Sequence, residues 1–271
     1  MRIRDKIKKP QRPVVAYEIL PPREKDGTLN AYAETISSLL SQTHIDAINI
    51  PEVNDEVGRG ERPVSNQERG EPRKFGMLLQ DIVGIEAIVN RVVVHMPLKK
   101  QMEWIQETYS KYEIDNLIIV GGESSKQKYP GPTVNESLEK ISQDNRTREN
   151  SILCGGICIP SRKKESKNLI RKSECGAEFF TTQVLCDSSN VIKMIKNYQE
   201  RCDKVNTFPR RILLSFAPVS SNKNIDFLKW LGVEIPKDTE KYLNGRPGSM
   251  TERSLDVAIE VLNEILAFIA N

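Results

Sequence analysis

The feature that most constrains the fold of this chain is the alternation of short β-branched runs with longer segments of helical period. Seven runs predict strands at 14–20, 46–50, 91–96, 116–120, 151–159, 178–185 and 211–216. Helical periodicity predicts helices near 30–42, 76–84, 98–112, 134–143, 165–174, 188–202, 222–231 and 251–268. Repeated strand–helix units of this kind indicate an α/β protein built on a parallel sheet.

The regularity of the alternation favours a (β/α)8 TIM barrel over a doubly wound sheet. The predicted strands are almost continuously apolar, which suits a parallel sheet buried on both faces. No glycine-rich dinucleotide motif follows the first strand. The sequence stops at Asn271, directly after the last predicted helix, so we expect the eighth strand to be short or missing. We predict one barrel domain over 1–271, with a basic N-terminal arm at 1–12 and a loop-like segment at 54–74.

Composition excludes several classes of function. Forty basic and thirty-seven acidic residues give a net charge of +3, and they are interspersed, so we expect no nucleic-acid partner. The basic N-terminus lacks the apolar core of a signal peptide, and no apolar run is long enough for a membrane span, which predicts a soluble, cytoplasmic protein. Five cysteines and two histidines favour reduced thiols and predict no metal site.

Polar side chains follow the ends of the predicted strands, where parallel barrels place their active sites. The most unusual is Glu18, a carboxylate inside the apolar run VVAYEIL that Pro21 and Pro22 end. Each such residue, taken alone, is equally consistent with a solvated strand end. As a set they predict a site at one mouth of the barrel: Glu18, Asn49, Glu52, Glu123, Arg162, Thr182, Gln183 and Ser220.

Four motifs, in chain order, point to one family. They are YEILPPR in the first strand, NLIIVGGES at the fourth, LIRKSECGAEFFTTQVLCD around the sixth, and LLSFAPVSS with LGVEIPKDTEKYL at and after the seventh. They resemble motifs of the methylenetetrahydrofolate reductases, flavin-dependent (β/α)8 barrels that reduce the methylene group of a folate to a methyl group. The resemblance spans residues 13–243, and the sixth-strand motif is the most specific part of it.

The resemblance implies roles for particular residues. Glu18 matches the family's general acid, which protonates a folate nitrogen as the five-membered ring opens to an iminium that accepts hydride. Glu123 matches the acidic residue beside the flavin and the pterin, Gln183 a pterin contact, and Lys172 a flavin-phosphate contact. We therefore expect Glu18 and Glu123 to be catalytic, Gln183, Glu123 and Asn49 to bind substrate, and Lys172, Gly122, Thr182 and Arg162 to bind the cofactor.

Elementary chemistry supports some of these roles and leaves alternatives open. Desolvation inside a barrel raises the pKa of a carboxyl, as a general acid requires, but Glu18 could equally be a structural carboxylate bonded to backbone or paired with Arg162. Gln183 can serve a pterin edge or bond to backbone at its strand end. Lys172 near a helix end is equally consistent with a solvated cation.

Two hypotheses of function follow. In the first, hydride passes from NADH or NADPH to a flavin, FAD by resemblance with FMN or no flavin as alternatives, and then to a methylene-tetrahydrofolate or related pterin. This would place the protein in one-carbon metabolism and methionine biosynthesis. In the second, the chain is a non-redox pterin-binding barrel, or a subunit that depends on an electron-delivering partner protein. A homo-oligomer is compatible with both.

Overall fold

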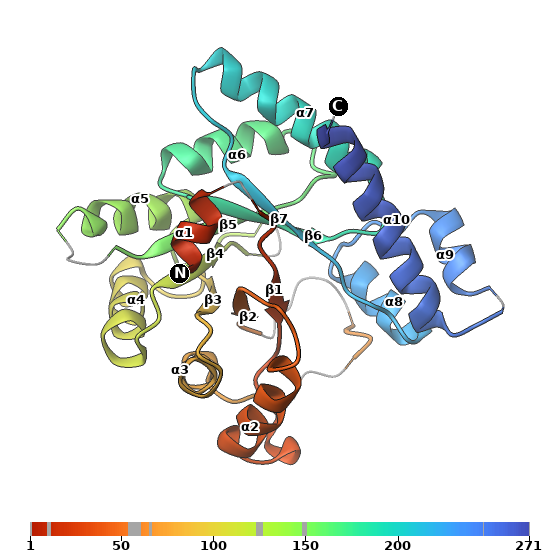
Figure 1. Ribbon diagram of the computed structural model, residues 1–271. Helices are drawn as coiled ribbons and strands as arrows, with labels where there is room; N and C mark the ends of the chain where they lie inside the picture. The colour runs from red at the N-terminus through yellow and green to blue at the C-terminus, as the bar shows by residue number, and fades with distance from the viewer. Residues whose placement is uncertain are drawn as a thin grey trace. The chain divides into compact units, whose positions relative to one another are not determined.

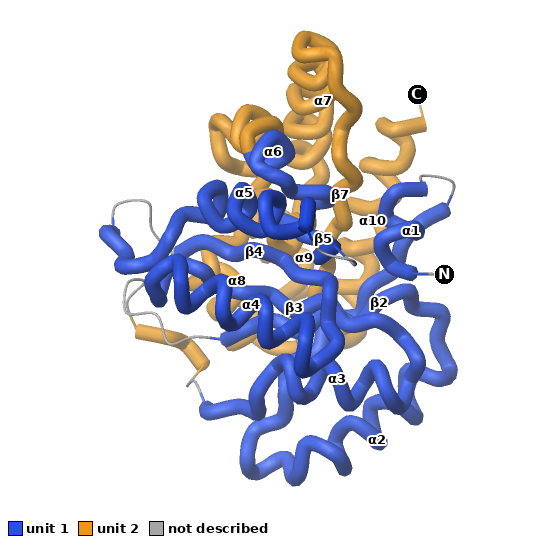
Figure 2. Tube along the Cα trace, turned by 90° about the vertical axis from the view of Figure 1, so that its left-hand side faces the viewer, with its two compact units in different colours: residues 1–58, 66–156, 172–179 blue, residues 59–65, 157–171, 180–271 orange. Residues whose placement is uncertain are grey.

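The computed structural model describes residues 2–9, 12–53, 61–64, 67–122, 127–147, 151–245 and 247–270. These residues form two compact units, which Figure 2 shows in different colours. Unit 1 consists of residues 1–58, 66–156 and 172–179, and unit 2 of residues 59–65, 157–171 and 180–271. The single-domain organisation expected from the sequence stays a prediction.

The strands of unit 1 are parallel and pair with their neighbours in the chain. They are β1 (Ala16–Glu18), β2 (Ala47–Ile50), β3 (Ala87–Val92), β4 (Asn116–Val120) and the start of β5 (Leu153–Cys158). All residues of β2 and β3 are buried. Isoleucine, valine and leucine are the commonest residues of β2, β3 and β4, because β-branched and large apolar side chains fit strands that are covered on both faces, whereas the three residues of β1 are exposed.

The strand order distinguishes the fold from a doubly wound sheet. With β6 (Phe179–Val184) and β7 (Arg211–Ser215), the sheet has seven strands in the order β1-β2-β3-β4-β5-β6-β7. A doubly wound sheet reverses direction at a switch point, whereas a TIM barrel follows chain order. The predicted α/β barrel class is therefore confirmed. No eighth strand is found among the described residues, as the sequence led us to expect.

Helices follow the strands along the chain, as Figure 1 shows. Several begin at a side-chain cap: Thr28 accepts from the Ala31 N–H, and Thr133 forms a capping box with Glu136. A short 3-10 turn covers Glu24–Asp26. The helices are α1 (Ile3–Lys8), α2 (Leu29–Leu40), α3 (Pro72–Val83), α4 (Leu98–Tyr112), α5 (Val134–Asn145), α6 (Glu165–Glu174), α7 (Ser189–Lys204), α8 (Asn222–Trp230), α9 (Lys237–Leu243) and α10 (Met250–Ala270).

The N-terminal arm is a docked helix at the amino ends of the strands of unit 1. Ile3 and Ile7 of α1 are buried. Its basic side chains contact acidic residues that directly precede β2, β3, β4 and β6 in the chain. The ion pairs are Arg2 with Glu86 and Asp115, Arg4 with Glu178 at 3.4 Å, Lys6 with Asp46 at 3.0 Å, and Lys8 with Glu178 at 2.7 Å. The basic composition of the arm thus serves the fold, and the carboxyl ends of the strands lie away from it.

Two predicted elements begin four residues too late, the first strand is shorter than predicted, and helix α9 was not predicted. The third strand covers Ala87–Val92 and not 91–96, because the polar residue Asn90 separates residues 87–89 from the apolar run on which the prediction was based. Val93 and Val94 are buried beyond its end. Helix α3 begins at Pro72, four residues before the predicted start, since proline is favoured in the first helical turn and Glu71 caps it. The loop-like segment therefore ends before 72.

Each unit has an apolar core. In unit 1, Phe75 and Leu79 of α3 are fully buried, as are Ile48 and Ile50 of β2. Unit 2 has two clusters, one of Val219, Ile225, Leu228, Val233 and Leu243 and the other of Leu185, Val191, Val261 and Ile265. All five cysteines remain thiols.

Candidate functional site

A carboxyl–amide pair joins the carboxyl ends of the first two strands. Glu18 is the last residue of β1, and it lies opposite Asn49 in the parallel register of β1 and β2. The Asn49 Nδ2 donates to Glu18 Oε2 at 2.7 Å. The sequence predicted both residues at strand ends, and the structure brings them into contact.

Glu18 combines accessibility with a perturbed pKa. Its side chain is exposed, whereas Asn49 is 8% exposed. Neighbouring protein nevertheless removes part of the hydration of the carboxyl, and this desolvation raises the pKa of Glu18 above its ordinary value of 4.5, while the hydrogen bond from Asn49 acts in the opposite direction. A carboxyl that a ligand can reach, and that holds its proton to higher pH than usual, is suited to donate that proton.

A third polar residue, Asn90 of β3, shares the sheet face of Glu18 and Asn49. Asn49 pairs in register with Ile88, and Asn90 follows two residues later, so alternation places its side chain on the same face. Ile50 and Ala87 lie on the opposite face, where they meet Gly76 of α3. The Oδ1 atoms of both asparagines are buried, and no group in the described part of the chain forms a hydrogen bond with either.

The other face of these strands carries a charged network that serves packing. Arg91 of β3 donates to Glu52 Oε1 at 2.5 Å and to Gln101 Oε1 at 2.9 Å, and its guanidinium lies 4.3 Å from the ring centroid of Trp104. Glu52 also accepts from the Val92 N–H at 2.8 Å. Desolvation raises the pKa of Glu52, although the charge of Arg91 acts to lower it. Glu52, a predicted strand-end residue, thus joins the segment after β2 to β3, and Arg91 joins β3 to α4.

The turn after β4 is covered by an aromatic side chain. A Cβ built on Gly122 would lie 2.2 Å from Cζ of Tyr129, so the tyrosine ring rests directly against the glycine. Tyr129 also meets the ring of His95 edge-on, with centroids 5.7 Å apart. Gly122 was predicted to contact the cofactor, and this close approach explains why glycine is needed there without a ligand. Glu123, predicted to be catalytic, lies outside the described residues.

In unit 2, the predicted residues of β6 bond to neighbouring protein. Thr182 is buried, and its Oγ1 accepts from the Ser215 N–H at 2.9 Å, which ties β6 to β7. Gln183 donates from Nε2 to the Leu231 carbonyl oxygen at 2.9 Å. Ser220, after β7, donates from Oγ to Asn224 Oδ1 at 3.1 Å. The backbone bond that the sequence left open as an alternative for Gln183 is present.

The two predicted cations lie in and before helix α6. Arg162 is exposed in the loop between β5 and α6, where its backbone accepts from the Glu165 N–H at 3.0 Å. Lys172 is half-buried near the end of α6, and its carbonyl oxygen accepts from the Ala177 N–H at 2.9 Å. These positions do not test whether Arg162 and Lys172 bind a phosphate group, so that role stays a prediction.

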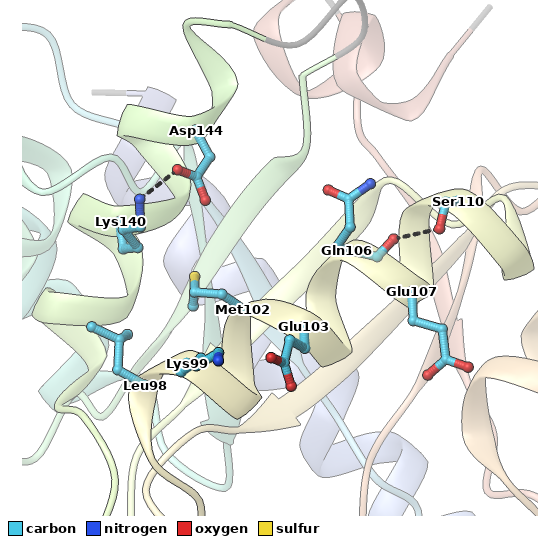
Figure 3. A pocket seen from close by; sticks show the side chains of 9 residues that line it. All are labelled: Leu98, Lys99, Met102, Glu103, Gln106, Glu107, Ser110, Lys140 and Asp144. Atoms are coloured by element: carbon cyan, nitrogen blue, oxygen red, sulfur yellow. Dashed lines mark hydrogen bonds and ion pairs between the residues drawn. The ribbon is translucent and has the colours of Figure 1, made fainter.

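A hollow of about 770 Å³ lies on the outer surface of α4 and α5, away from the predicted site residues. Figure 3 shows the ion pair between Lys140 and Asp144 at one side of it and Met102 facing it from α4. None of the residues predicted from the sequence lines it. Its lining residues are Leu98, Lys99, Met102, Glu103, Gln106, Glu107, Ser110, Lys140 and Asp144.

In the described part of the chain, no group of three or more His, Cys, Asp or Glu side chains is arranged to hold a metal ion. No helix there is long and apolar enough to cross a membrane.

Seven parallel strands in chain order, with polar side chains at their carboxyl ends, define the class: an α/β barrel protein with its candidate site at the strand ends. Residues 157–269 match the sequence model of the methylenetetrahydrofolate reductase family. The resemblance that the motifs indicated is thereby confirmed over this part of the chain. No curated protein sequence matches the chain.

One solved structure supports the fold. An uncharacterized protein from Clostridium thermocellum that binds two copies of 5-methyl-5,6,7,8-tetrahydrofolic acid is similar with a TM-score of 0.78 and 21% sequence identity, over 98% of this chain and 87% of that chain. At this identity the similarity shows the fold alone. Weaker matches are 2,3-dimethylmalate lyase (TM-score 0.49, 10% identity, 99% and 95% covered) and the chitinase domain of a spore coat protein from Clostridium difficile (0.45, 12%, 78% and 67%).

Proposed function

We propose that the chain binds a reduced folate at the carboxyl ends of β1 and β2 and acts on its methylene group in the manner of a methylenetetrahydrofolate reductase. The observation that carries this proposal is the raised pKa of Glu18, an accessible carboxyl held by the amide of Asn49. The family match over 157–269 supports the reaction class. The similar Clostridium thermocellum protein, which binds 5-methyltetrahydrofolic acid, supports the ligand class.

Glu18 would act as the general acid. Its raised pKa keeps the proton on the carboxyl closer to neutral pH, where it can be passed to a ring nitrogen of the folate. Protonation weakens the bond between that nitrogen and the methylene carbon, and when the bond breaks the methylene group becomes an iminium ready for hydride. The Asn49 Nδ2 then stabilises the carboxylate that is left, because it already donates to Oε2.

A flavin, FAD in the family that the sequence resembles, would supply the hydride when bound, with NADH or NADPH as electron donor. The described residues fit it in part. Arg162 of unit 2 and Lys172 of unit 1 each carry a positive charge suited to a phosphate group. Gly122 and Thr182 are engaged by protein groups. The alternatives to FAD are FMN as the bound cofactor, or no flavin at all.

The second candidate is a folate-binding protein without redox activity, or a subunit that receives electrons from a partner protein. Tyr129 favours it, because its ring occupies the space against Gly122 where the sequence predicts a cofactor contact. In such a protein Glu18 and Asn49 would bind the pterin without transferring a proton.

Calorimetric titration of the purified chain with 5-methyltetrahydrofolate tests the binding, and p-aminobenzoylglutamate alone serves as a control for the pterin ring. We expect the folate to bind and the control to fail. Incubation with FAD then separates the two candidates: the reductase should turn yellow and bleach when NADH is added. A chain that binds folate but stays colourless, with no change in melting temperature in FAD or FMN, supports the second candidate. Absence of folate binding would refute both.

A further inference from the structure

Two buried acceptors on one face of the sheet are unsatisfied. Asn49 and Asn90 are 8% and 9% exposed, and among the described residues the Oδ1 atom of neither has a hydrogen-bond partner. In the structure Asn49 Nδ2 donates to Glu18 Oε2, which directs the amide nitrogen, and not Oδ1, towards the carboxyl group. Buried polar atoms in folded proteins are nearly always hydrogen-bonded, so two unpaired oxygen atoms on one face of a sheet need an explanation.

The sheet does not require polar groups at these positions. Neighbouring strand residues in the register, Ile88 beside Asn49 and Ile118 beside Asn90, are apolar and buried. A leucine would fill a similar volume without leaving an acceptor unpaired. Asn116 on β4 provides the contrast, because it is also buried, yet its Nδ2 donates to the Ala87 carbonyl oxygen at 3.2 Å and its Oδ1 is not among the unsatisfied atoms.

We infer that Asn49 and Asn90 are acceptors for the N–H groups of the ligand's pteridine ring, and that they select a 2-amino-4-oxo pterin. This inference rests on the proposed function. A pterin presents the ring N3–H and the 2-amino group side by side, which supplies donors for two acceptors. The corresponding edge of a flavin has one N–H between two carbonyl oxygens. That N–H can donate to one asparagine oxygen, but a carbonyl oxygen of the flavin would then lie against the other asparagine oxygen, and two acceptors cannot form a hydrogen bond.

The inference predicts an opposite effect of one substitution on stability and on binding. Asn90→Leu removes an unsatisfied acceptor, so the ligand-free variant should melt a few degrees higher than the wild type. The same change should weaken 5-methyltetrahydrofolate binding about 5- to 100-fold, through loss of a buried hydrogen bond. The matched control is Asn116→Leu, which should lower the melting temperature and leave the affinity unchanged. Asn49 is left intact because it also holds Glu18.

A measurement on the wild-type chain gives an independent test. A 2-desamino-2-methyl analogue of 5-methyltetrahydrofolate should bind about 5- to 100-fold more weakly than the parent compound, because one donor is lost. Equal affinity for the two compounds would refute the inference while leaving folate binding, and so the proposed function, standing. If neither compound binds, both fail.

Measuring flavin binding gives a third test of the inference. If Asn90→Leu weakens binding of FAD but not of 5-methyltetrahydrofolate, the acceptor serves a flavin and the inference is wrong. If the variant is more stable and both affinities are unchanged, a buried water occupies the site and the inference is again wrong.

Discussion

Replacing Glu18 with glutamine tests whether this carboxyl donates a proton. The variant keeps the size of the side chain and an oxygen that can accept from Asn49 Nδ2, so the hydrogen bond of 2.7 Å can be retained. The change removes the acidic proton. A positioned general acid contributes about 10²- to 10⁴-fold, which is about 2.7–5.4 kcal/mol at 1.36 kcal/mol per tenfold.

The assay follows conversion of methylene- to methyltetrahydrofolate by mass spectrometry, with FAD and NADH present. We expect turnover to fall by that factor in Glu18→Gln, while 5-methyltetrahydrofolate still binds and NADH still bleaches the flavin, because neither event uses the proton. Glu34→Gln, on the exposed side of α2, is the control and should behave as the wild type. Near-normal turnover in Glu18→Gln together with a sharply lower melting temperature would refute the reasoning.

The same variant makes a prediction about pH and stability that does not depend on activity. The pKa of Glu18 is raised in the folded chain above 4.5, so the folded state takes up this proton at higher pH than the unfolded state does. Folding stability contributed by this group therefore rises as pH falls through the folded pKa towards 4.5, and this component should be absent in Glu18→Gln. Carbon-13 NMR of the wild-type carboxyl should show its titration above 4.5, and a midpoint at or below that value would contradict the desolvation argument.

Three further substitutions test the packing around the site. Gly155→Ala should destabilise the fold by about 1–3 kcal/mol, since its Cβ would lie 2.4 Å from Cζ of Phe179, and Phe179→Leu in the same chain should restore part of the loss in denaturant unfolding. Asp46 has a lowered pKa, so wild-type stability is lost as pH falls below 3.8, and an acid titration of Asp46→Asn should lack this component. Arg91→Met leaves the carboxylate of Glu52 unpaired, and chemical denaturation should register a loss of about 3–5 kcal/mol. Unchanged unfolding in any of the three would contradict the contact it tests.

The pattern of hydrophobic residues was sufficient for the class of fold and for most element positions, because burial on both faces of a parallel sheet leaves a direct trace in the sequence. Strand β4 lies where predicted, at Asn116–Val120. The third strand was predicted four residues too late because Asn90 interrupts the apolar pattern. Arg91 is tolerated inside the buried strand because Glu52 and Gln101, which other elements contribute, accept its hydrogen bonds.

For the candidate site, the sequence pointed to Glu18 because a carboxylate inside an apolar strand is unusual. It pointed to Asn49 because this polar residue lies at the end of a predicted strand. Their contact needs the register of two strands whose residues are 31 apart in the chain. The sequence did not predict that Asn90 would share their face with an unsatisfied oxygen, nor that Tyr129 would lie against Gly122.

The sequence by itself thus determined the alternation of strands and helices, the parallel barrel class and the candidate acid, because each depends on residues close together in the chain. Only the tertiary structure decided which polar groups are satisfied by protein and which are left for a ligand. Hydrogen bonding and desolvation depend on atoms that folding brings together from distant segments, so the raised pKa of Glu18 and the unpaired oxygens of Asn49 and Asn90 have no local signature.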